Sequence, residues 1–514
     1  MYDWIRWMYR DMEYVVKVGK SCLDTFTSFI GVLAGDSLSP TLWNIYFSDF
    51  FIPEHPDDVV WEGVHPYSHV EHADDIALVS FSPEGLQHAL DHLNVWCRKN
   101  FMSISVPKSH LWTSLALQSE SIPLLIVADQ ALSYVTEYNF VGIRFDSVCP
   151  YMYDKHYKVK ATQARLSKDA IFSRVENRVG SLPVKEGLVL YTAKVDPYLI
   201  AGCEIVLDID MTVVEELCQV SLTFLRHLLG VHPKTGVCFL HAETGVMPLH
   251  FRRLILALRY LRYLGALLND HLMALALRES IALREVGKPS WIGDLQRVLA
   301  RLAPSVVLNH HDLSVPTISS LITNIEAVCL RSLNDEIEVM VKGAMLRLSM
   351  KRIPGVGGLH PRKNTLSRRS YLTVPIPAHR KALTRLLMSS HVLAVEVLRW
   401  SERYRLYIPH DWCLCRFCRV AVEDEQHALL VCATAPGLVC LRRKFFVDIL
   451  RVCPQLLVAW NALGNDDRLA CLLQLPAAEP LLAQFVHNVF EIFRSVPVYI
   501  PPLWLYTAAS GGNM

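Results

Sequence analysis

The sequence predicts an α+β fold: a small antiparallel sheet with helices, then a mainly α-helical region and a small module rich in cysteine and histidine. Residues 68–81 (SHVEHADDIALVSF) predict two short strands, because apolar runs flank a polar pair typical of a tight turn. Residues 251–268 carry apolar side chains at helical spacing, as do other stretches between 150 and 340. Cysteine and histidine residues at 415–432 follow a C-x₂-C-x₈-H-x₄-C pattern, which indicates the small module.

The composition indicates a globular protein. The chain has 514 residues, of which 52% are hydrophobic and 20% charged, and this length predicts about three domains. We expect no transmembrane helix, because no run of 18 uncharged apolar residues occurs. The first residues do not resemble a signal peptide, so we expect an intracellular location, in the nucleus or cytoplasm. The 14 cysteines are then expected to be reduced.

The net charge of +1 conceals two oppositely charged regions. Residues 1–147 contain 19 Asp and Glu against 8 Lys and Arg, a net charge of −11. Residues 342–405 contain 14 Lys and Arg against two Glu, a net charge of +12. This split favours one region that handles cations and another that handles phosphate, although solvated helix faces would explain any single charge.

The remaining elements follow in chain order. A helix is predicted from about residue 86, with Ser82, Pro83 and Glu84 as start signals and Asn100 as the end. Short strands are predicted at 103–106, 124–127 and 140–145. The Pro-, Gly- and Arg-containing stretch 351–377 reads as an exposed linker. Helices are predicted at 378–404 and from 437 to 494.

Two adjacent carboxylates, Asp74 and Asp75, occupy the predicted turn of residues 68–81. Like charges this close repel each other unless a cation lies between them. Proteins use such pairs to hold divalent metals, as in enzymes that transfer phosphoryl groups with two Mg²⁺ ions. An isolated Ala-Asp-Asp would usually be only a polar turn, so its meaning depends on the flanking sequence.

The flanking sequence resembles the reverse transcriptases of non-LTR (LINE-type) retrotransposons. Residues 31–50 (GVLAGDSLSPTLWNIYFSDF) resemble the family's Gly-Asp-Pro-Leu-Ser-Pro loop and the helix after it. Residues 86–100, ending in WCRKN, resemble a palm helix, and residues 102–109 (MSISVPKS) resemble the next motif. Residues 138–145 (YNFVGIRF) resemble the hairpin that grips the primer. The sequences of these motifs are most similar to those of elements from fungal genomes.

The resemblance implies a partial polymerase palm at 1–147 and a helical, thumb-like and connection region at 148–340. It implies RNA-directed DNA polymerisation with an RNA template, a DNA primer and two Mg²⁺ ions. Asp74 and Asp75 would be the catalytic metal ligands. Gly35 and Asp36 would belong to the nucleotide- and template-binding loop, and Lys108 would lie near the triphosphate.

The chain also departs from this family. Members carry a further metal-bridging Asp upstream of the Gly-Asp loop, and only 35 residues precede Asp36. That carboxylate and the fingers domain are missing, so we expect impaired catalysis, unless the reading frame begins further upstream. Asp11 and Asp24 lack the apolar strand context of the missing residue. His72, Ala34 and Ser37 replace the usual residues.

The C-x₂-C-x₈-H-x₄-C residues Cys415, Cys418, His427 and Cys432 suit a closed tetrahedral Zn²⁺ site. The alternative is a group of unrelated buried cysteines. The pattern also resembles the C-terminal CCHC zinc knuckle of the same family. We therefore expect a zinc knuckle at 411–436, followed by a helical tail at 437–514.

The basic linker and helix at 341–410 contain aromatic residues at 371, 400, 404 and 407. Cations for phosphate and aromatic rings for base stacking are typical of surfaces that bind single-stranded nucleic acid. We expect the Arg-rich loop 362–369 to contact phosphate, whereas the aromatic residues could equally pack on the protein. Two alternatives to a polymerase thus stay open: a nucleic-acid-binding remnant that acts through this segment and the knuckle, or a fragment that folds poorly.

Overall fold

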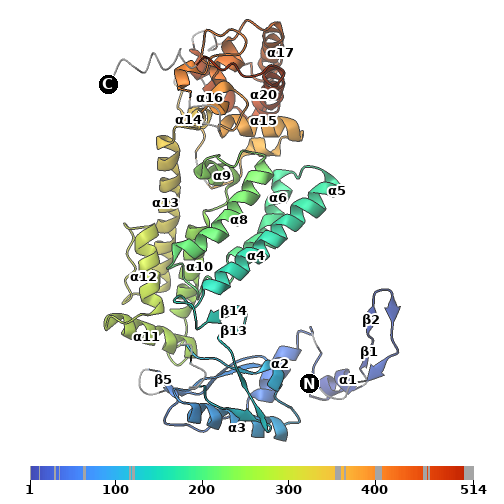
Figure 1. The fold of residues 1–514 in the computed structure, drawn as a ribbon, viewed down its shortest axis with the longest axis vertical. Coiled ribbons are helices and arrows are strands. Elements are labelled where there is room, and N and C mark those ends of the chain that lie inside the picture. Colours follow the sequence, from blue (N-terminus) through green and yellow to red (C-terminus); the bar gives the residue numbers. More distant parts are fainter. Residues whose placement is uncertain are drawn as a thin grey trace. The chain divides into compact units, whose positions relative to one another are not determined.

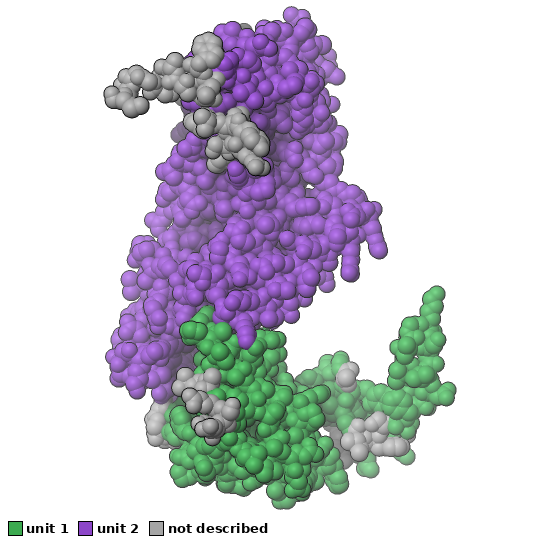
Figure 2. All heavy atoms as spheres, viewed as in Figure 1, with its two compact units in different colours: residues 1–152 green, residues 153–514 purple. Residues whose placement is uncertain are grey.

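The computed structural model describes residues 2–502 except 11, 28–30, 34, 62–64, 115–116, 118–121, 354–360, 364–365, 400–407, 455, 457–459 and 461–462. The chain divides into two compact units, residues 1–152 and 153–514, which are coloured separately in Figure 2. The first unit mixes helices with short strands and the second is helical, which confirms the α+β class.

The N-terminal unit contains three helices and several paired short strands among its described residues. Its helices are α1 (Tyr2–Arg10), α2 (Ser39–Phe47) and α3 (Pro83–Lys99), and a 3₁₀ turn, η1 (Val106–Lys108), follows α3. Antiparallel pairs are β1 (Glu13–Tyr14) with β4 (Phe26–Thr27), β2 (Lys17–Val18) with β3 (Ser21–Cys22), β5 (Val59–Trp61) with β6 (His65–Tyr67), β7 (His69–His72) with β8 (Asp75–Leu78), β10 (Ile126–Val127) with β11 (Gln130–Ala131) and β13 (Glu137–Phe140) with β14 (Ile143–Asp146). β9 (His110–Leu111) and β12 (Ser133–Tyr134) pair in parallel.

Helix α3 organises the core of this unit. Ser82 caps it by accepting a hydrogen bond from the Gly85 amide, and Asn100 ends it, as the sequence predicts. Ala89 and Leu93 pack toward Phe47 of α2, whereas other α3 residues pack toward β9 and β10. Helix α3 therefore has apolar residues on two faces, and it packs both against the β7–β8 hairpin and against the strands β9 and β10.

The strands differ from the expectation in two respects. Each pairing among the described strands joins only two strands, so no larger sheet forms there. The strand predicted at 103–106 is wrong: the chain turns into η1 instead. Pro107 lies in the first positions of η1, and its ring fixes φ and removes an amide donor that a strand would need.

The C-terminal unit is a succession of helices (Figure 1). They are α4 (Asp154–Ala170), α5 (Asn177–Val179), α6 (Val184–Leu190), α7 (Asp196–Leu199), α8 (Met211–Leu229), α9 (Val237–Thr244), α10 (Leu249–Leu264), α11 (Leu272–Glu285), α12 (Trp291–Leu302), α13 (Val315–Val339), α14 (Ala344–Met350), α15 (Pro377–Leu387), α16 (Ala394–Val397), α17 (Pro436–Val452), α19 (Asn465–Leu473) and α20 (Glu479–Arg494). Short π segments η3 (Ile171–Glu176), η4 (Tyr191–Val195) and η7 (His427–Val431), and the 3₁₀ turns η5 (Ser370–Thr373), η6 (His410–Trp412) and η8 (Pro476–Ala478), join them.

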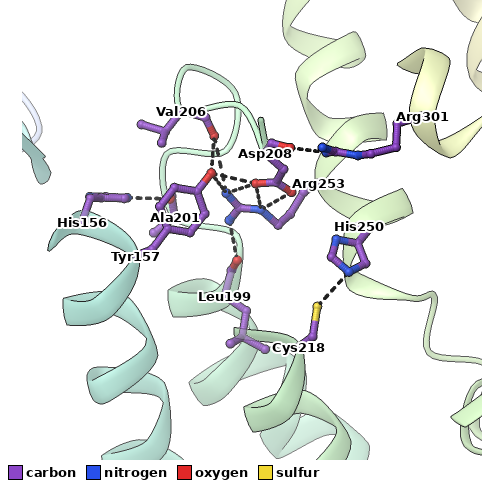
Figure 3. A network of polar contacts seen from close by, with 10 residues as sticks. All are labelled: His156, Tyr157, Leu199, Ala201, Val206, Asp208, Cys218, His250, Arg253 and Arg301. Atoms are coloured by element: carbon purple, nitrogen blue, oxygen red, sulfur yellow. Dashed lines mark hydrogen bonds and ion pairs between the residues drawn. The ribbon is translucent and has the colours of Figure 1, made fainter. Parts of the chain in front are cut away.

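A buried ion pair anchors the first half of this unit. Arg253 of α10 lies 2.8 Å from Asp208, and its guanidinium also donates to the carbonyl of Leu199 at 2.7 Å (Figure 3). Tyr157 of α4 donates to the same Asp208 carboxylate at 2.8 Å. The network holds α4, the 199–208 loop and α10 together, beside an apolar core of α10, α12 and α13.

The helix predicted at 378–404 is interrupted. It consists of α15 and α16, with residues 388–393 between them, and residues 400–407 lie outside the described part of the chain. Ser389 adopts a left-handed φ of 47°, which an α-helix does not tolerate. Its hydroxyl accepts a hydrogen bond from the buried Gly343 amide, so a tertiary contact stabilises the break.

Among the described residues, no single helix has the length and apolar character needed to cross a membrane. One pair, Asn465–Leu473 with Pro476–Arg494, meets the criteria only jointly and is bent by 88°.

Candidate functional sites

The acidic pair lies in the two-residue turn between β7 and β8. His72 and Asp75 are the last partners of the antiparallel ladder, which leaves Ala73 and Asp74 to form the turn. Ala73 has a φ of 54°, a conformation that is rare for alanine and typical of tight hairpin turns. Both carboxylates are exposed at the tip of the hairpin. Hard, exposed carboxylate oxygens are ligands that Mg²⁺ accepts.

A hydrogen bond from an indole side chain connects helix α2 to this turn. Trp43 Nε1 donates a 2.8 Å hydrogen bond to the carbonyl of Ala73. The Trp43 ring stacks on Phe47 of the same helix at 5.7 Å between ring centres, and Phe47 is buried in the core. The bond therefore brings the helix after the Gly-Asp loop against the acidic turn. The sequence analysis did not identify Trp43 as a site residue. A tryptophan in the short helix that follows the Gly-Asp loop could have indicated a hydrogen-bond donor near the site.

The Gly-Asp loop precedes α2 and contains a glycine with a left-handed backbone conformation. Gly35 has a φ of 86°, which suits glycine and strains other residues. Asp36 Oδ2 accepts a 2.9 Å hydrogen bond from the Tyr9 hydroxyl of α1. The Ser39 hydroxyl donates to the carbonyl of Leu33 at 2.6 Å and closes the loop. Gly35 is exposed and Asp36 half-buried, so the loop presents its backbone to solvent. Ala34 lies outside the described residues.

Lys108 lines a hollow of about 440 Å³. His110 and Arg144 add two further basic side chains to its lining, and Tyr138 and Asn139 come from the β13–β14 hairpin. Glu137 lies 3.7 Å from Arg144 and offsets part of that charge. Lys108, predicted to lie near the triphosphate, and the β13–β14 hairpin, predicted to contact the primer, thus line the same hollow.

The four residues of the C-x₂-C-x₈-H-x₄-C pattern converge in the C-terminal unit. Their ligand atoms all lie within 4.8 Å of one another. Cys415 and Cys432 Sγ are 3.9 Å apart, and Cys418 Sγ is 3.4 Å from His427 Nε2. Tetrahedral bonds of about 2.3 Å to sulfur and about 2.0 Å to nitrogen require separations of about 3.8 and 3.5 Å. The donor set and its spacing therefore fit a four-coordinate metal ion.

Local backbone bonds shape this cluster. The amide of Cys415 donates to Ala421 at 2.8 Å, and the amide of Arg419 donates back to Cys415 at 2.8 Å. Burial raises the pKa of Cys415 to about 12. Burial also acts to raise the pKa of Cys418, but backbone amides such as that of Ala421 outweigh it and lower this pKa. Burial lowers the pKa of His427, which favours the neutral imidazole that a metal requires.

Arg416, between the two cysteines, points into the protein. Arg416 is buried and bonds Glu423 with its side chain at 2.6–3.1 Å. It also donates to the carbonyls of Phe493, Val392 and Val496, two of which lie at the end of α20 or just beyond it. The sequence analysis did not predict that Arg416 would bind Glu423 in the interior. The charged residue between Cys415 and Cys418 was the signal that could have indicated it.

The predicted phosphate contact of the 362–369 loop is wrong for two of its arginines. Arg362 and Arg369 both bind Glu243, at 3.5 and 3.2 Å, and Glu243 is completely buried. Arg362 also lies 3.6 Å from Glu479. A buried carboxylate needs such partners, so these cations serve the fold.

The predicted base-stacking aromatics receive no support from the structure. Tyr371 is completely buried, and the rings at 400, 404 and 407 lie outside the described residues.

The comparisons with known proteins bear on the N-terminal unit. The family model described as reverse transcriptase (RNA-dependent DNA polymerase) matches residues 2–145. No curated protein matches the chain. The matched range contains the Gly-Asp loop, the acidic turn, Lys108 and most of the β13–β14 hairpin. Residues 2–145 are therefore similar to the reverse transcriptase family.

Proposed function

We propose that the N-terminal unit is the palm of a reverse transcriptase derived from a non-LTR retrotransposon, which acts on an RNA template and a DNA primer. The observation that carries this proposal is the exposed Asp74-Asp75 turn held against α2, inside the range that the family model matches. Asp74 and Asp75 would hold Mg²⁺, which supplies the positive charge that stabilises the transferred phosphoryl group.

The neighbouring residues have separate roles in this proposal. Gly35 and Asp36 shape the loop that contacts the template and the incoming nucleotide, and Tyr9 holds Asp36 in place. Lys108, which lines the hollow, offers its ammonium group to the triphosphate. The β13–β14 hairpin lines the same hollow and would contact the primer.

We further propose that the 514-residue chain extends primers poorly. Two carboxylates on one turn provide few ligands for two Mg²⁺ ions, each of which demands octahedral coordination. Without a third carboxylate the metals would be bound weakly, and interactions made only in the transition state would be lost.

A primer-extension assay on an RNA template with Mg²⁺ tests both proposals. Asp75→Asn removes one carboxylate, and Asp129→Asn is the matched control, because Asp129 is an exposed turn residue that already has a left-handed φ of 62°. Extension abolished by Asp75→Asn and kept by Asp129→Asn supports the polymerase and refutes the impairment. Measurable extension that is equal in wild type and Asp75→Asn refutes the assigned catalytic site, whereas no extension by either chain agrees with the proposed impairment.

For residues 411–436 we propose a structural Zn²⁺ site rather than a surface that reads nucleic acid. Arg416 and Phe417 lie between the ligands and contact Phe493 near the end of α20, at 5.3 and 5.1 Å. The zinc content of Cys415→Ser tests the site, with exposed Cys440→Ser as control. Equal zinc in Cys415→Ser and wild type would refute it.

A further inference from the structure

A second group of potential metal ligands lies in the C-terminal unit, far along the chain from the knuckle cysteines. It consists of Glu215, Cys218 and His250, whose ligand atoms all lie within 4.8 Å of one another. Figure 3 shows the Cys218 thiol and the His250 ring pointing toward each other, and their Sγ and Nε2 atoms are 3.3 Å apart. Neither the polymerase proposal nor the knuckle uses these residues.

Two packed helices supply the three ligands. Glu215 and Cys218 are three residues apart on α8, a spacing that places both side chains on one face of the helix. His250 is in the first turn of α10, which packs against α8. Gln219 donates a hydrogen bond to Glu215 Oε1 one turn along α8 and so restrains the carboxylate.

The backbone beneath the cluster is well anchored. Arg253 follows His250 by three residues and is held by Asp208 in the buried network described above (Figure 3). On α8, Leu217 and Val214 are buried beside the two ligands. A site on rigid helices keeps its ligands in place before the ion arrives, which reduces the entropy lost on binding.

The protonated Cys218 thiol is a poor nucleophile, and the neutral His250 imidazole is ready to bind a metal ion. Burial, then Glu215 and Asp208, raises the pKa of Cys218 to about 12, so the thiol keeps its proton until a cation displaces it. Burial lowers the pKa of His250, which leaves the imidazole neutral near pH 7. His250 Nδ1 is buried and has no hydrogen-bond partner among the described residues.

We propose that Glu215, Cys218 and His250 form a second binding site for a divalent transition metal ion, with zinc as the best match. An S, N and O donor set at these separations suits Zn²⁺, and three protein ligands leave a fourth position for water. The thiolate and the carboxylate together balance the charge of the ion. Glu215 is exposed and His250 half-buried, so an ion can enter from solvent.

The test measures zinc bound per chain after the full-length protein is equilibrated with buffered Zn²⁺ and freed of excess ion. We expect Glu215→Gln to weaken this site by at least about tenfold, since loss of even an indirect ligand contact costs that much. Glu215 is exposed, so its change to Gln leaves the helix core intact. Glu216→Gln is the matched control, because Glu216 binds Arg165 at 3.0 Å instead.

Cobalt substitution supplies a second readout. Cys218→Ala should reduce the thiolate-to-cobalt absorption of the loaded protein, whereas Cys203→Ala, at another buried cysteine of the same unit, should leave it unchanged. Unchanged zinc content in Glu215→Gln together with an unchanged cobalt spectrum in Cys218→Ala would overturn the site. Both measurements are independent of polymerase activity, and the knuckle ligands contribute equally to each variant and to its control.

Discussion

Removal of the Arg416 side chain should destabilise the C-terminal unit strongly. Arg416 and its partner Glu423 are both almost completely buried, with side-chain exposures of 3% and 0%. Arg416→Ala leaves the Glu423 carboxylate in the interior without its cation. It also removes the donors to the carbonyls of Phe493, Val496 and Val392, which join the loop between Cys415 and Cys418 to α20 and to the residues before α16.

The expected magnitude follows from what remains around Glu423. Removal of one partner of a buried ion pair costs about 3–5 kcal/mol. Glu423 keeps two backbone donors, the amides of Ala394 and Arg416, each at 2.8 Å. These bonds solvate part of the charge, so we expect the lower end of the range, about 3 kcal/mol.

Urea unfolding followed by circular dichroism measures this change. With a slope of about 3 kcal/mol per molar urea for a unit of this size, the midpoint should fall by about 1 M. Arg451→Ala is the control: Arg451 is exposed at the end of α17, and its loss should change stability by less than about 0.5 kcal/mol. A loss below about 1 kcal/mol in Arg416→Ala would refute the view that this arginine neutralises Glu423 in the interior.

Three further predictions concern other contacts. Trp43→Phe removes the hydrogen-bond donor to the Ala73 carbonyl and should lower the free energy of unfolding by about 1 kcal/mol. Hydrogen exchange at the amides of residues 73–75 should accelerate, and unchanged exchange would contradict the contact. Zinc chelation should lower the unfolding temperature of wild type more than that of Cys415→Ser, because metal-binding energy stabilises the fold and the variant lacks the knuckle site; equal shifts would point to a different site. Burial lowers the pKa of His241 to about 4, below its ordinary 6.5. The unfolded chain then binds the extra proton, so stability should decline by about 3 kcal/mol as pH falls from about 6.5 to 4, and His241→Gln should flatten this part of the unfolding profile.

Features that depend on neighbouring residues were predictable from the sequence. The Ser82 and Asn100 caps of α3 and the hairpin around Asp74 depend on contacts within a few residues. The C-x₂-C turn is local in the same way, and its spacing predicted the convergence of Cys415 and Cys418 with His427 and Cys432. Local hydrogen bonds and turn conformations need no knowledge of the rest of the chain.

The tertiary structure decided which charged and polar groups face inward. Arg362 and Arg369 read as phosphate ligands in the sequence, but they neutralise Glu243, which lies over a hundred residues earlier. Cys218 and His250 lie 32 residues apart on different helices, and no spacing rule connects them. Helix packing brings such groups together, and burial then selects their partners, because an unpaired charge in the interior is too costly. The sequence by itself therefore determined the local motifs and the family resemblance of the first 145 residues, and only the tertiary structure showed which cations are used inside the fold.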